Sequence, residues 1–258
     1  MPIDKYIDKI EGVRTSHKTR LQDPTYYDNG LYLLLPETSE HSDILVGQTR
    51  LVYTSNKEPT MKSLNINPQN NDNRDPLYQD GYLGNINNQQ ALELNNYQWG
   101  FTLNPILFVE FLNILKSGNA LNENNKKVDP RRIEAILDDI LEARDPSRAE
   151  WLNSRYEIKK ENKKIYYMKF IKGSLLAVEE ELDKDTLMED KQINLDDWLR
   201  NPTSQGLPRK NAKTGEFNYW YPRNGVVAGF GASSGRAYLD CFGILRTRIP
   251  ASGYVVQT

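Results

Sequence analysis

Residues 224–256 carry the clearest pattern in this chain, and they read NGVVAGFGASSGRAYLDCFGILRTRIPASGYVV. The stretch contains no Lys, Glu, Gln, Met or Trp, although these five residue types make up about a fifth of the whole chain. Average protein composition would place several of them in a window of this length. The gap therefore requires a specific cause.

A two-residue alternation runs through the centre of this stretch. Because successive side chains of a β-strand point to opposite faces, the alternation predicts a half-buried strand. The residues expected to face inward are Gly235, Ala237, Leu239 and Cys241, and those expected to face outward are Arg236, Tyr238, Asp240 and Phe242. Tyr, Ser, Gly and Arg dominate adaptable binding surfaces, although an ordinary edge strand with a mixed outer face fits the same pattern.

The length and charge of the chain limit its class. A chain of 258 residues suits one large domain or two small ones, with a sizeable core. The formal net charge is −2, from 33 Lys and Arg against 35 Asp and Glu. A nucleic-acid-binding protein needs a clustered basic excess, so we expect no nucleic-acid partner.

Compartment signals are sparse. The first twelve residues, MPIDKYIDKIEG, are charged and lack an apolar segment, so we expect no signal peptide. No apolar run approaches the roughly 20 residues of a membrane span, so we expect no direct membrane insertion. The single cysteine, Cys241, fits a reducing compartment. We expect synthesis in the cytosol, and leave association with a virion or a cell surface open.

Turn and cap signals divide the chain into strands near both ends and helices between them. We expect strands at 31–35, 44–46 and 165–171, and helices at 105–117, 131–144, 147–157 and 195–199. Each of the first three helices follows an Asn-Pro or Asp-Pro pair, which supplies a capping residue and a Pro for the first turn. This order favours an α+β fold over a doubly wound parallel sheet.

An asparagine-rich segment occupies residues 65–96. Asn and Asp side chains compete with regular structure by bonding to their own backbone, so we expect a long loop.

The chain offers few candidates for catalysis or metal binding. His17 and His41 are its only histidines, and neither belongs to a local ligand motif, so we expect no bound metal and no cofactor. The run GFGASSG at 229–235 resembles a phosphate loop but lacks a following Lys and helix. Cys241 falls on the small, inward side of its strand, which is typical of an inert buried thiol. We therefore expect no catalytic residues and no enzyme activity.

The run WYPRNGVVAGFGASSGRAYLDCFGILRTRIPASGYVV at 220–256 resembles the C-terminal part of C-type-lectin-fold proteins of the formylglycine-generating-enzyme type. More narrowly, it resembles the variable proteins of diversity-generating retroelements, including those of archaea and their viruses. In that family, adenine-directed mutagenesis rewrites Asn-type codons that keep a pyrimidine in third place. Such codons cannot encode Lys, Glu, Gln, Met or Trp, which is the set missing here.

The resemblance implies a single C-type-lectin-like domain over residues 1–258, with antiparallel strands, a helical middle and a variable region at 224–250. It also implies a binding protein that recognises varied ligands, which we expect to be proteins. The implied ligand-binding and variable positions are Phe230, Gly231, Ser233, Ser234, Arg236, Tyr238, Asp240, Phe242, Ile244, Leu245, Arg246, Thr247 and Arg248. Ala232, Ala237, Leu239 and Cys241 would form the fixed scaffold, and 252–256 the closing strand.

Two alternatives remain open from the sequence. One is an enzyme of the formylglycine-generating or ergothioneine-type branch of the same fold. The first of these branches uses two cysteines and the second a histidine-rich iron motif, whereas this chain has one cysteine and two histidines. The other alternative is a viral structural or tail protein whose C-terminal strand is exposed but not diversified.

Overall fold

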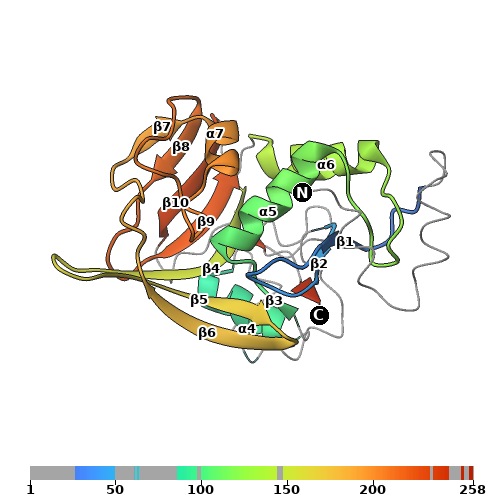
Figure 1. Cartoon of the computed structure of the whole chain (residues 1–258), viewed down its shortest axis with the longest axis horizontal. Coiled ribbons are helices and arrows are strands. Elements are labelled where there is room, and N and C mark those ends of the chain that lie inside the picture. The colour runs from blue at the N-terminus through green and yellow to red at the C-terminus, as the bar shows by residue number, and fades with distance from the viewer. Residues whose placement is uncertain are drawn as a thin grey trace.

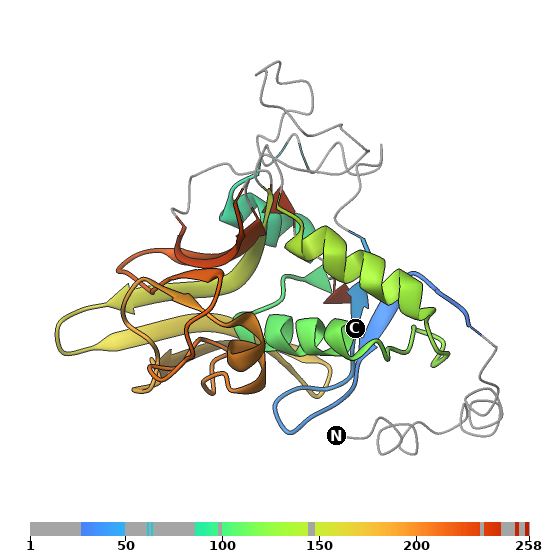
Figure 2. The same cartoon turned by 90° about the horizontal axis from the view of Figure 1, so that it is seen from above.

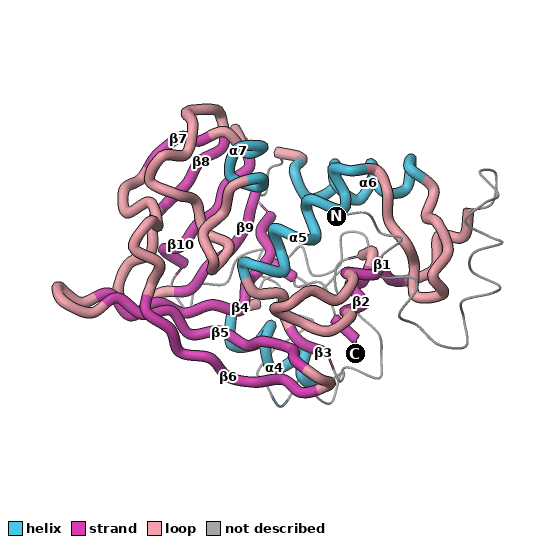
Figure 3. Tube along the Cα trace, in the orientation of Figure 1, coloured by secondary structure: helices cyan, strands magenta, loops and turns pink. Residues whose placement is uncertain are grey.

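A central helix, α5 (Pro105–Ser117), packs between two β-sheets (Figure 1). This computed structural model describes residues 27–49, 61, 63, 86–97, 100–143, 148–232, 235–243, 251–252 and 256–257. In the tube view the larger sheet lies to the left of α5, and β1 (Tyr32–Leu35) and β2 (Ile44–Gly47) lie to its right (Figure 3). Helices and a mostly antiparallel sheet together confirm the α+β class.

The smaller sheet joins segments that are far apart in the sequence. Its strand order is β1, β2, β12 (Val256–Gln257) and β3 (Gly100–Phe101). β12 pairs antiparallel with both β2 and β3, through Val256 opposite Val46 and Phe101. The last described strand therefore lies beside strands from the first half of the chain.

The larger sheet contains most of the second half of the chain. Its strand order is β6 (Ser174–Glu181), β5 (Lys163–Ile171), β4 (Arg148–Ile158), β9 (Val227–Ala232), β10 (Ala237–Gly243), β8 (Phe217–Trp220) and β7 (Lys191–Ile193), with β11 (Ala251–Ser252) beside β4. Neighbours on this path are antiparallel except β10 with β8, and β11 is parallel to β4. The β4–β5 hairpin projects away from the helices (Figure 2).

Both ends of α5 are set by the signals expected from the sequence. The Asn104 side chain accepts a hydrogen bond from the backbone N–H of Leu107 at 2.9 Å, and Pro105 follows in the first turn. Gly118 ends the helix in the left-handed region, with φ of 64°. Phe108, Phe111 and other apolar side chains of the helix are buried against the sheets. The prediction for 105–117 is confirmed.

Two further helices begin where their caps are. α6 (Pro130–Leu141) follows Asp129, whose side chain accepts from the N–H of Arg131, and it ends three residues before the predicted boundary. α7 (Leu195–Arg200) follows Asn194, whose side chain accepts from the N–H of Asp197. Among the described residues, no helix is long and apolar enough to cross a membrane.

The helix predicted at 147–157 is wrong, because this segment forms the strand β4. The strand lies inside the larger sheet, between β9 and β5, and Ala149 to Leu152 are all buried. A strand covered on both faces loses the two-residue alternation that identifies it in a sequence. The Asp-Pro pair before it therefore precedes a strand, not a helix.

The loop predicted at 65–96 is also wrong over its last part, where α4 (Asn88–Tyr97) forms. Asn87 and Gln90 make a reciprocal cap: the N–H of Gln90 donates to the Asn87 side chain at 2.8 Å, and the N–H of Asn87 donates to the Gln90 side chain at 3.0 Å. Asparagine, taken as a loop signal, here begins a helix. Residues 65–85 lie outside the described part of the chain.

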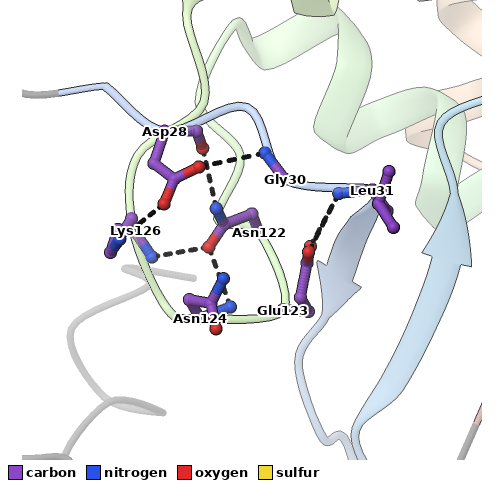
Figure 4. Close-up of polar contacts among 7 residues, drawn as sticks. All are labelled: Asp28, Gly30, Leu31, Asn122, Glu123, Asn124 and Lys126. Atoms are coloured by element: carbon purple, nitrogen blue, oxygen red, sulfur yellow. Dashed lines mark hydrogen bonds and ion pairs between the residues drawn. The ribbon is translucent and has the colours of Figure 1, made fainter.

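A compact polar cluster ties the start of β1 to the loop between α5 and α6 (Figure 4). The Glu123 carboxylate accepts hydrogen bonds from the N–H groups of Leu31 and Tyr32, at 2.9 and 3.0 Å. Lys126 forms an ion pair with Asp28 at 2.5 Å. Gly30 has a φ of 59°, a region that favours glycine, and a Cβ there would displace the Glu123 carboxylate.

Candidate functional site

The alternation predicted for β10 is confirmed from Ala237, which is half-buried against the core, to Cys241; Gly235, expected to face inward, precedes the strand and is exposed. Leu239 and Cys241 are fully buried, on the side covered by α5 and α7. Tyr238 and Asp240 point to the opposite side and are half-buried, and Arg236, just before the strand, is exposed. The strand therefore separates a packed inner face from an accessible outer face.

Phe230, expected on the outward side, lies instead in the core. Its side chain is 1% exposed. The ring centroid of Phe230 lies 4.9 Å from that of Phe108 and 5.5 Å from that of Phe217. The strand register explains the error, because Phe230 pairs with the inward Leu239. Paired residues share a face of a sheet, so Phe230 cannot contact a ligand on the outer face.

The remaining expected positions differ in how the structure places them. Gly231 is on the outer face but buried, because the Tyr238 ring covers it. Phe242 lies in β10, but only its backbone is described. Ser233, Ser234 and residues 244–248 lie outside the described residues.

Neighbouring strands extend the accessible face beyond the predicted residues. The parallel pairing of β10 with β8 sets Tyr238 opposite Asn218 and Asp240 opposite Trp220. On the other side of β10, β9 places Gly231 opposite Tyr238 and Gly229 opposite Asp240. Gly229 and Gly231 are buried, under the rings of Trp151 and Tyr238. We call the half-buried side chains of this surface the outer patch: Asn218, Trp220, Tyr238 and Asp240.

An aromatic pair forms the centre of the outer patch. The rings of Trp220 and Tyr238 meet edge to face, with centroids 5.2 Å apart and an interplanar angle of 73°. Burial, with a smaller contribution from the Asp240 charge, raises the pKa of Tyr238. Its hydroxyl therefore stays protonated at neutral pH and is available as a hydrogen-bond donor. Tyr and Trp are the side chains that most often anchor protein interfaces.

A groove of about 390 Å³ opens on the same face of the sheet, between α4 and the β5–β6 hairpin. Val227 forms part of its wall and pairs with Arg155, which in turn pairs with Tyr166. Val227 lies two residues from Gly229 and thus on the same face as the outer patch. The groove floor is largely apolar, with Leu92 and Met168 among its lining side chains.

Charged and aromatic groups mark one wall of the groove. The Arg155 guanidinium lies 5.7 Å from the centroid of the Tyr166 ring. The Tyr166 hydroxyl donates to the Glu157 carboxylate at 2.9 Å, and this hydrogen bond is the largest cause of the raised pKa of Tyr166. A cation held over an aromatic ring beside an apolar floor is a common composition for a protein-binding surface.

The side chains relevant to catalysis lie away from this face. Tyr156 donates to the Cys241 sulfur at 3.6 Å inside the core, and burial raises the pKa of the Cys241 thiol. A thiol so placed stays protonated and unreactive at neutral pH. His41 is buried against Glu110 of α5, at 2.6 Å. His17 lies outside the described residues, within which no group of His, Cys, Asp and Glu side chains could hold a metal ion.

Sequence reasoning missed several residues of this face. Phe217 to Trp220 alternate as β10 does, so the outward direction of Asn218 and Trp220 was readable from the sequence. Their position beside Tyr238 was not, because a parallel pairing of β8 with β10 leaves no local signal. Arg155 was hidden by the incorrect helix prediction for its segment.

Comparison with protein-family models, with curated proteins and with solved structures finds no match to this chain.

Proposed function

We propose that this chain is a binding protein that recognises protein ligands with the outer face of its larger sheet, through a C-terminal surface that is diversified. The contacting residues are those of the outer patch together with Arg236. The groove beside α4 extends the same surface toward β5 and β6.

One observation carries this function: β10 separates its residues into a fully buried scaffold and an accessible, chemically mixed face. Leu239 and Cys241 contribute to the core, whereas Arg236, Tyr238 and Asp240 do not. Backbone ladder bonds to β9 and β8 hold the strand, and these bonds do not depend on side-chain identity. Outward side chains can therefore change without the loss of stability that core substitutions cause.

The diversification itself is proposed from two sequence features. Lys, Glu, Gln, Met and Trp are absent from 224–256. This absence fits codons in which adenines at the first two positions are replaced while the third position stays a pyrimidine. The resemblance of 220–256 to the variable proteins of diversity-generating retroelements points the same way. The C-type-lectin-like fold belongs to this proposal, supported by a last strand that pairs beside strands from early in the chain.

The enzyme alternative has less support in the described residues. A catalytic cysteine or histidine needs access to substrate, and Cys241 and His41 are both buried. The viral structural alternative also accounts for the exposed face of β10. It does not account for the absence of Lys, Glu, Gln, Met and Trp from 224–256. Its difference from the proposed function is genetic, so a genetic test separates the two.

Sequencing the genomic neighbourhood of the gene tests the proposed function. We expect a reverse-transcriptase gene and a near-copy of the segment that encodes 224–256. At each position where the gene and the copy differ, the copy should carry adenine. These differences should be concentrated in the codons for Arg236, Tyr238 and Asp240. Codons for Ala237, Leu239 and Cys241 are the matched controls and should be identical in the two copies. Mismatches spread evenly over both sets, or no copy at all, would refute diversification.

A further inference from the structure

A second hollow lies on the opposite side of the larger sheet, next to α7. Its volume is about 630 Å³, and its walls come from the end of α7 and the loop that leads to β8. Arg200, Arg209 and Lys213 line it, with the amides of Asn201 and Asn211. Three cationic side chains around one hollow are notable in a chain whose net charge is −2.

The only carboxylate among the lining residues, Asp197, is already engaged. Its side chain is 13% exposed and accepts from the backbone N–H of Lys213 at 2.8 Å. The Lys213 ammonium lies 3.8 Å from the same carboxylate, beyond hydrogen-bond distance. Asp197 therefore holds the loop in place and forms only a long ion pair with Lys213, and among the described residues it forms none with Arg200 or Arg209.

Two of the cations keep donors available. The Arg200 side chain donates from Nε to the carbonyl oxygen of Asp196 at 3.1 Å, and within the described residues its terminal nitrogens have no partner. Arg209 donates from Nε to the carbonyl oxygen of Pro202 at 3.0 Å, and one terminal nitrogen donates to the Asp185 carboxylate at 3.4 Å in an ion pair. These bonds fix the Arg209 guanidinium while its second terminal nitrogen is left to donate.

The loop that carries Arg209 and Lys213 is held rigidly. The Trp198 indole donates to the carbonyl oxygen of Gly206 at 3.0 Å, and the N–H of Lys210 donates to the carbonyl oxygen of Asp185 at 2.8 Å. Gly206 has a φ of 77°, and a Cβ there would meet the backbone at the start of α5. A donor set on a fixed frame loses little entropy when it binds a ligand.

We propose that this hollow is a binding site for a small oxyanion-bearing ligand, held by Arg200, Arg209 and Lys213. Guanidinium groups match the geometry of phosphate, sulfate and carboxylate oxygens, and the lysine adds a mobile point charge. The volume exceeds that of a single inorganic anion, so we infer a phosphorylated, sulfated or carboxylated small molecule. The site is separate from the outer patch and does not depend on the function proposed for that surface.

Titration with inorganic phosphate, sulfate and acetate, at an ionic strength held constant with sodium chloride, tests this site. The readout is the ¹H–¹⁵N NMR resonances of the Nε–H groups of Arg200 and Arg209. We expect saturable shifts at both groups with at least one of the oxyanions. Shifts with phosphate or sulfate assign a tetrahedral ester, and shifts with acetate assign a carboxylate. No saturable shift with any of them overturns the site.

Variants separate a specific site from general charge attraction. The double variant Arg200→Gln with Lys213→Gln changes exposed side chains, so we expect an unaltered fold. We expect the dissociation constant of the oxyanion, read from the Arg209 resonance, to rise about tenfold or more. Arg131→Gln is the matched control, because that side chain is 92% exposed on another helix. Equal weakening by the control and by the double variant would overturn the site.

Discussion

The ring of Tyr238 on β10 lies over the backbone of Gly231 on β9. A Cβ added to Gly231 would lie under 3.0 Å from the Tyr238 ring and hydroxyl, closer than real Cβ atoms come to such groups. The two positions face each other across the strand pair, and the side chain of one occupies the space above the other. Variation at these two expected variable positions is therefore coupled.

We predict that Gly231→Ala lowers the free energy of unfolding by about 1–3 kcal/mol when Tyr238 is present, because the new methyl group displaces the ring. In a Tyr238→Ser background the same change should cost less than about 1 kcal/mol, because the space is open. Urea denaturation of the four variants in a double-mutant cycle measures this coupling. Additive effects would contradict the contact.

Phe230 should behave as a core residue and not as a binding residue. Its ring packs against those of Phe108, Phe217 and Trp198, so we predict that Phe230→Ala lowers the free energy of unfolding by about 3–5 kcal/mol. The control is Arg236→Ala, an exposed change expected within about 0.5 kcal/mol of the parent protein. Similar losses for the two variants, measured by chemical denaturation, would refute the assigned faces.

His41 should make the stability of the protein depend on pH. Its Nδ1 lies 2.7 Å from the carbonyl oxygen of Ser42 and its Nε2 lies 2.6 Å from the Glu110 carboxylate, so both ring nitrogens face acceptors. Burial lowers the pKa of His41, but the Glu110 hydrogen bond and charge, together with the Ser42 carbonyl and the Asp43 charge, outweigh burial, and the net shift is upward. The protonated ring is thus the better fit to this pocket.

A folded-state pKa above the unfolded one stabilises the protein at low pH, and this contribution is lost as pH rises. We predict that the free energy of unfolding falls as pH rises above about 6.5, the ordinary value for histidine. His41→Gln should remove this slope. Urea midpoints over a pH series compare the two proteins, and parallel curves would contradict the ion pair.

Local signals in the sequence predicted the elements that local chemistry controls. Asn104 and Gly118 bound α5 because a cap and a left-handed glycine act within one turn of the helix. The directions of Ala237 to Cys241 in β10 followed from alternation alone, whereas Gly235, expected to face inward, is exposed. The α+β class followed from the order of such elements.

Tertiary packing decided what the sequence did not predict. Trp151 is buried on a strand covered at both faces, where a helix was expected, and one of the two neighbours of this strand, β9, comes from a distant part of the chain. Phe230 was assigned outward because its register with Leu239 was unknown. The surface formed by Trp220 and Tyr238 likewise depends on a strand pairing that no short motif encodes.

Deep sequencing of the codons for residues 200–258 in a natural population tests the central claim most directly. The account predicts that substitutions concentrate at Arg236, Tyr238 and Asp240, while Phe230, Leu239 and Cys241 stay fixed. Variation that is flat across these six codons, or equal to that of residues 100–200, would contradict a diversified binding surface.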